Sequence, residues 1–116
     1  MKKLELLRKK YRDLNGEIDS ILGLLKEFET KHVKTIAPSI VSKRLDKSYI
    51  ETIFLLGLAE KVDILKKSYQ VYTVDSNFFL GEFNDSNEIP RILHNPATGS
   101  DVTRDDYVVD LVYHFA

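Results

Sequence analysis

Three histidines are the side chains of this sequence best suited to move protons near neutral pH. They are His32, His94 and His114, and they are widely separated along the chain. Asp110 and His114 share one side of a predicted strand, but four residues of extended chain span about 13 Å. That distance is too long for an acid–base pair, so the sequence predicts no catalytic residues and a protein that is not an enzyme.

The sequence lacks the residues that commonly bind metals or cofactors. The chain contains no cysteine, which excludes disulfides, a thiol nucleophile and thiolate metal ligands. Asp101, Asp105 and Asp106 lack the regular oxygen spacing of a calcium loop, and no glycine-rich phosphate loop is present. We therefore expect no cofactor and no bound metal.

The composition is that of an ordinary globular chain. Its 116 residues are 43% hydrophobic and 30% charged, and no apolar run is long enough to span a membrane. A cytoplasmic location without membrane contact is the expectation. Residues 71–116 hold two Lys/Arg against eight Asp/Glu, and this acidic end would repel DNA phosphates.

An apolar stripe in residues 1–33 is the strongest pattern. Apolar side chains recur at alternating spacings of three and four, which predicts a coiled-coil-type helix near 30 residues long. We expect another polypeptide to cover this stripe, either in a homodimer or in a complex with a larger partner protein. The open alternative is that the stripe packs against the chain's own body. Its residues are Leu4, Leu7, Tyr11, Leu14, Ile18, Ile21, Leu25 and Phe28.

Residues 34–74 predict two short helices followed by a strand. Pro38 suits the first turn of a helix that ends near Leu45, and Asp46 or Ser48 can cap a second helix that ends near Lys61. Lys66, Lys67 and Ser68 are expected to form a charged turn, followed by a strand over residues 69–74.

This order of elements resembles the winged helix-turn-helix family over residues 35–74. The resemblance rests on Ile40-Val41 followed by Leu45, on the segment from Leu55 to Lys61, and on a basic hairpin tip. It implies that the second helix enters the DNA major groove while the hairpin contacts the backbone. The DNA-binding candidates that it implies are Lys43, Arg44, Lys47, Ser48, Glu51, Thr52, Lys66 and Lys67.

Residues 75–116 predict strands joined by turns. Two expected hairpins resemble a zinc ribbon, but its knuckle positions are occupied by residues other than cysteine, so metal binding is not expected there. Turn-forming residues such as Asp75, Asn77, Pro96 and Gly99 are expected to maintain the geometry instead. An ordinary antiparallel meander explains the same pattern. The knuckle positions fall near Thr73, Ser76, His94 and Ala97.

The sequence thus predicts an α+β fold of three segments: an association helix over 1–33, a winged-helix-like part over 34–74 and a ribbon-like β extension over 75–116. The leading functional hypothesis is a non-catalytic interaction subunit that assembles through the N-terminal helix. The resemblance to a small winged helix joined to a ribbon implies an accessory component of a bacterial defence or conflict system. The alternative is a dimeric winged-helix regulator that binds duplex DNA.

Overall fold

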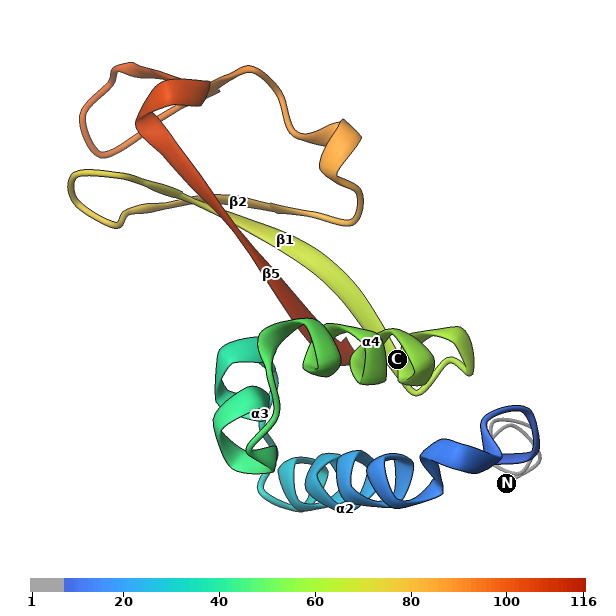
Figure 1. Cartoon of the computed structure of the whole chain (residues 1–116). Helices are drawn as coiled ribbons and strands as arrows, with labels where there is room; N and C mark the ends of the chain where they lie inside the picture. The colour runs from blue at the N-terminus through green and yellow to red at the C-terminus, as the bar shows by residue number, and fades with distance from the viewer. Residues whose placement is uncertain (1–7) are drawn as a thin grey trace. The chain divides into compact units, whose positions relative to one another are not determined.

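The computed structural model describes residues 8–116 and has a mixed α+β fold with two small antiparallel sheets (Figure 1). After a helical stretch at residues 8–10, the elements follow in this order: η1 (Arg12–Leu14), α2 (Asn15–Thr30), α3 (Pro38–Leu45), α4 (Tyr49–Lys61), β1 (Leu65–Thr73), β2 (Phe79–Phe83), η2 (Ser86–Glu88), β3 (Ile92–His94), β4 (Asp101–Thr103), η3 (Arg104–Asp106) and β5 (Tyr107–Phe115).

The chain divides into two compact units. In the described part, the first unit consists of residues 8–66 and Tyr113–Ala116, and the second of Lys67–Val112. The boundaries expected after residues 33 and 74 do not coincide with this division, because β1 and β5 each run from one unit into the other.

The expected uninterrupted N-terminal helix is not present in the described residues. The backbone leaves the helical region at Tyr11 (φ −122°, ψ 57°), and a single 3₁₀ turn, η1, precedes α2. Residues 13–16 read Asp-Leu-Asn-Gly, and Asp, Asn and Gly are poor helix formers. A spacing pattern of apolar residues continues across such a break, which is why the pattern alone predicted one rod.

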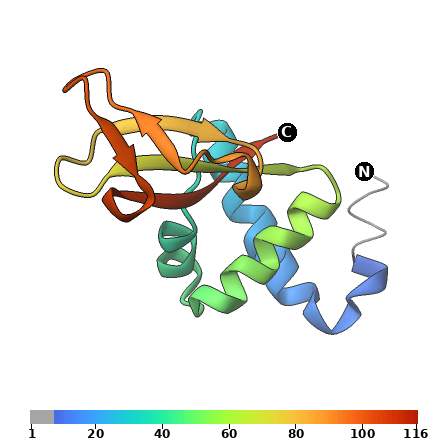
Figure 2. The same cartoon turned by 90° about the horizontal axis from the view of Figure 1, so that it is seen from above.

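The first unit is built on α2, α3 and α4, which pack against one another (Figure 2). Pro38 begins α3 at its first turn, as expected, and Ser48 caps α4. Two strand-like contacts bring the end of the chain into this unit. Ile36 and Tyr113 exchange backbone hydrogen bonds of 2.7 and 2.9 Å, and the Ala116 N–H donates to the Ile64 carbonyl.

The second unit packs a small hairpin against the larger sheet. The larger sheet has the order β2-β1-β5, with Tyr69 opposite Phe83 in the β1–β2 register, while β3 pairs with β4. Leu80, Phe83, Ile89 and Leu93 surround a buried cluster formed by Val71, Val102 and Tyr107.

One local prediction near the start of β1 was wrong, and one strand was missed. Lys66, Lys67 and Ser68 form no turn, because β1 continues through them and buries Ser68. The strand β4 was not predicted, because its three residues contain one apolar side chain, Val102. The predicted strand that holds Asp110 and His114 is present as β5.

Candidate interaction surface

The helix α4 carries large apolar side chains on its outward side as well as on its buried side. The inward side consists of Thr52, Leu55, Leu56, Leu58 and Ala59. On the outside, the side chains of Tyr49, Ile50 and Phe54 are 53%, 82% and 49% exposed. We call these three residues the α4 outer face. Large apolar side chains are usually buried, so this face is a clear departure from ordinary burial in the described part of the first unit.

The N-terminal segment reaches the α4 outer face through one aromatic contact. The Tyr11 ring meets the Phe54 ring edge to face, with centroids 6.2 Å apart. Tyr11 is half-buried, and so is Ile53 on α4. The aromatic pair therefore borders the exposed apolar surface and restricts the orientation of Phe54.

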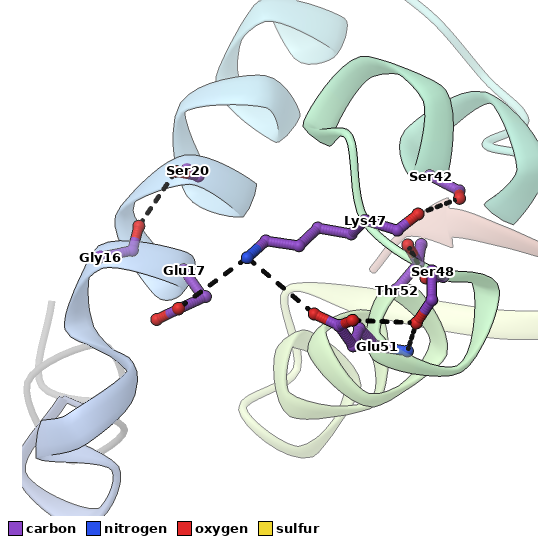
Figure 3. A network of polar contacts seen from close by, with 8 residues as sticks. All are labelled: Gly16, Glu17, Ser20, Ser42, Lys47, Ser48, Glu51 and Thr52. Atoms are coloured by element: carbon purple, nitrogen blue, oxygen red, sulfur yellow. Dashed lines mark hydrogen bonds and ion pairs between the residues drawn. The ribbon is translucent and has the colours of Figure 1, made fainter.

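A polar network holds the turn between α3 and α4 against α2 (Figure 3). The Lys47 ammonium lies 3.9 Å from carboxylate oxygens of both Glu17 and Glu51. The Ser42 hydroxyl donates to the Lys47 carbonyl, and Asp46 adopts a left-handed conformation (φ 53°) that ends α3. The start of α4, and with it the outer face, is thereby fixed relative to α2.

Ser48 and Glu51 form the cap of α4. The Ser48 hydroxyl oxygen accepts a 3.1 Å hydrogen bond from the Glu51 backbone N–H, and its hydroxyl lies 3.1 Å from a Glu51 carboxylate oxygen. The Thr52 hydroxyl donates to the Ser48 carbonyl at 2.8 Å. Such a cap satisfies N–H groups that the first helical turn leaves without partners.

A second ionic cluster joins α2 to α3. The Glu27 carboxylate accepts hydrogen bonds from Lys31 at 3.2 Å and from Arg44 at 2.5 Å. These two cations, Lys31 first, lower the pKa of the Glu27 carboxyl group. The Arg44 guanidinium also lies 6.0 Å from the centroid of the Phe28 ring, so this arginine is engaged on two sides.

Most of the predicted DNA-binding residues of the first unit are engaged in contacts within the fold. Arg44 and Lys47 are paired with carboxylates, Ser48 and Glu51 form a helix cap, and Thr52 is fully buried. Lys66 and Lys67 lie on β1, in different units, and not at a hairpin tip. Lys43 remains exposed on α3.

The apolar stripe divides into three groups. Leu4 and Leu7 lie outside the described residues, and Tyr11 and Leu14 are half-buried. The remaining four stripe residues are buried on the face of α2 that packs with α3 and α4, which is the alternative left open above. In this conformation they are not accessible to a second polypeptide. They are Ile18, Ile21, Leu25 and Phe28.

Two buried polar side chains organise the turns of the second unit. Thr73 is 3% exposed, and its hydroxyl oxygen accepts a 2.9 Å hydrogen bond from the Phe78 N–H. Asn95 is 5% exposed, and its side-chain oxygen accepts from the Ala97 N–H at 3.0 Å. Asn77 and Gly99 take positive φ angles in these turns, as turn-forming residues do.

Of the three histidines, His32 and His114 line one surface hollow of the first unit, whereas His94 belongs to the second unit. His94 lies 3.6 Å from Asp101 across the β3–β4 pair, while the His114 ring nitrogen Nδ1 lies 3.0 Å from the Lys34 carbonyl and His32 is exposed at a helix end. Residues 8–116 contain no group of three potential metal ligands. Asp101, Asp105 and Asp106 are all exposed.

Each unit also has a hollow on its surface. In the first, a space of about 530 Å³ lies beside α2 and includes Gly23, Ile64 and Phe115 in its lining. In the second, Arg91 and Arg104 contribute to the lining of a smaller space of about 210 Å³.

No protein-family model, curated protein or solved structure matches this chain. Within residues 8–116, none of the helices has the length and apolar character required to cross a membrane.

Proposed function

We propose that this chain is a non-catalytic protein-interaction module that binds its partner through the α4 outer face. The observation that carries the proposal is the 82% exposure of Ile50, with Tyr49 and Phe54 about half exposed on the same helix. Exposed apolar groups of this kind mark protein-interaction sites, and aromatic side chains commonly supply much of the binding energy there.

The charges around α4 also favour a protein partner. Between residues 49 and 59 the helix contains one charged residue, Glu51. A surface with tyrosine, isoleucine and phenylalanine at its centre and few charges matches the centre of a protein interface. In contrast to the stripe hypothesis, this proposal uses side chains that the fold leaves accessible.

The N-terminal segment has a supporting role in this proposal. Tyr11 contacts Phe54 and so places one member of the apolar stripe at the border of the α4 outer face. An accessory role beside a larger effector, as the resemblance to proteins of bacterial defence systems implies, is compatible with such a module.

A winged-helix DNA-binding regulator is the second candidate. It is favoured by the order of α3, a tight turn and a capped α4, followed by β1. A base-reading helix, however, presents hydrogen-bonding side chains to the groove. The outer residues Ile50 and Phe54 have none. Retardation of duplex DNA at low salt that Lys43→Glu abolishes would support this candidate.

A photo-crosslinking residue placed at position 50 in the native cell tests the proposed function. We expect a protein adduct at this position and none at position 20, because Ser20 is an exposed polar residue of α2 whose hydroxyl donates to the Gly16 carbonyl. An adduct with nucleic acid would favour the second candidate. The absence of any adduct at position 50, at normal expression and folding, would contradict an interaction at this face.

A further inference from the structure

Four residues of α4 form a second stripe, distinct from the N-terminal apolar stripe, along the exposed side of this helix. In this subsection, the stripe means these four residues. Ile50, Phe54, Gly57 and Lys61 follow one another at spacings of four, three and four, which places them on one face of a helix. Ile50, Phe54 and Lys61 are exposed, and Gly57 is half-buried. The stripe therefore continues the α4 outer face to the end of the helix.

Gly57 leaves an open position on the stripe, one helical turn after Phe54. A Cβ atom added at Gly57 would meet no atom within 4 Å. Glycine inside a helix costs about 1 kcal/mol relative to alanine, and here the fold has room for alanine. A bulky exposed ring and an unfilled position thus lie one helical turn apart on the same stripe.

We propose that a second copy of this chain covers the stripe, with its own α4 antiparallel to the first. This inference rests on the proposed function and names the partner. A two-fold axis that passes between residues 54 and 57 would place each Phe54 ring over Gly57 of the second copy. Both copies would use the same patch, as in a closed two-fold dimer, and the small glycine would allow the helices to approach closely.

Two charged residues complement this arrangement: Glu51 beside the stripe and Lys61 at its end. Glu51 and Lys61 are ten residues apart on one helix, a separation of about 15 Å, so they do not pair within one chain. In the antiparallel pair, Glu51 lies beside Lys61 of the second copy, on both sides of the two-fold axis. The Glu51 side chain is 59% exposed and can therefore reach a second copy. A parallel pair would instead place like charges together.

Charge reversal tests the pairing of Glu51 with Lys61. Only an intermolecular contact between these two residues predicts that the double variant recovers the dimer affinity that each single variant loses. Glu51→Lys and Lys61→Glu are each expected to weaken the dimer about tenfold, because each converts two attractive contacts into repulsive ones. The double variant is expected to recover an affinity close to that of the unchanged chain. A mixture of the two single variants should form a heterodimer in preference to either homodimer. Sedimentation equilibrium measures all four cases.

Alanine substitution at two glycines provides a matched pair. Gly23 and Gly57 both lie in helices with open space at the Cβ position. Both substitutions should raise the unfolding temperature, but only Gly57→Ala should weaken dimerisation. Equal effects of the two substitutions on dimerisation would overturn the placement of Phe54 over Gly57.

The outcomes separate this inference from the proposed function. An unchanged chain that remains monomeric at all concentrations, or a double charge variant no better than the single variants, overturns the antiparallel pair. In that case, a crosslink from position 50 to a different protein would still support the interaction module. The absence of any crosslink, together with a monomeric chain, overturns both.

Discussion

The Tyr11 ring meets the Phe54 ring edge to face, with planes at 86° and centroids 6.2 Å apart. This contact joins the segment before α2 to the exposed side of α4. Phe54 is 49% exposed in spite of this neighbour. The arrangement therefore leaves an aromatic group that is oriented by one neighbour and about half exposed, which is why we propose this face as a binding surface.

The N-terminal stripe residues on α2 are buried, so their substitution should lower the free energy of unfolding. Ile18 is fully buried in the first unit, so Ile18→Ala should lower the free energy of unfolding by about 2–4 kcal/mol. Leu22→Ala, at a half-buried position of the same helix, is the control and should cost less. Chemical denaturation measures both. A change in assembly mass at unchanged stability would instead indicate an intermolecular seam at Ile18.

The cap of α4 predicts a loss of stability when its acceptor is removed. Ser48→Ala should cost about 1 kcal/mol, because the Glu51 N–H loses its side-chain acceptor. Ser48→Thr retains both the acceptor and the hydroxyl donor toward Glu51 and should remain close to the unchanged protein. Thermal unfolding of the three proteins provides the comparison, and equal destabilisation by both substitutions would refute the capping role.

The Glu27 cluster predicts a specific dependence on pH. Lys31 and Arg44 lower the pKa of Glu27 in the folded protein, so the unfolded chain binds its proton more readily. The stabilisation is fully present above the ordinary carboxyl pKa and is lost as the pH falls through the lowered value. NMR titration should find a low pKa that rises in Arg44→Gln. A pKa unaffected by that substitution would contradict the cluster.

The turn between β3 and β4 predicts a requirement for a side-chain acceptor at position 95. Asn95→Ala should destabilise the second unit by about 1 kcal/mol, because the Ala97 N–H loses the side-chain oxygen of the buried Asn95 as its acceptor. Asn95→Asp keeps the acceptor and serves as the matched control. Amide hydrogen exchange at residues 92–103 reports the local effect. Unchanged exchange in Asn95→Ala would show that the backbone bonds alone maintain the turn.

The helices of the first unit could be predicted from the sequence because their boundaries carry strong local signals. Pro38 and Ser48 determine where α3 and α4 begin, through a fixed φ angle and a capping hydroxyl. The break at Tyr11 could not be predicted from periodicity, because an apolar pattern is insensitive to a short irregularity. The adjacent residues Lys66 and Lys67 indicated a turn. In β1, however, their side chains lie on opposite sides of the strand, where Lys66 is exposed and Lys67 is half-buried.

The sequence alone indicated part of the candidate site. The sequence shows that Tyr49, Ile50 and Phe54 are apolar, but only the packing of α4 reveals which side is buried. The roles of Arg44 and Lys47 also depended on the fold, because their carboxylate partners are 17 and 30 residues away along the chain, at Glu27 and Glu17. Thr73 and Asn95 were missed as turn anchors, although polar residues at strand ends are a usable signal.

The most direct test of an interaction through the α4 outer face is light scattering of the chain over a concentration series. Ile50→Asp is compared with Ile92→Asp, because both replace an exposed isoleucine, on α4 and on β3 respectively. We predict that the unchanged chain and Ile92→Asp approach the mass of two chains with increasing concentration, while Ile50→Asp retains the mass of one. Equal masses for the unchanged chain and Ile50→Asp at every concentration, with no crosslink from position 50 to any protein, would contradict an interaction through the α4 outer face.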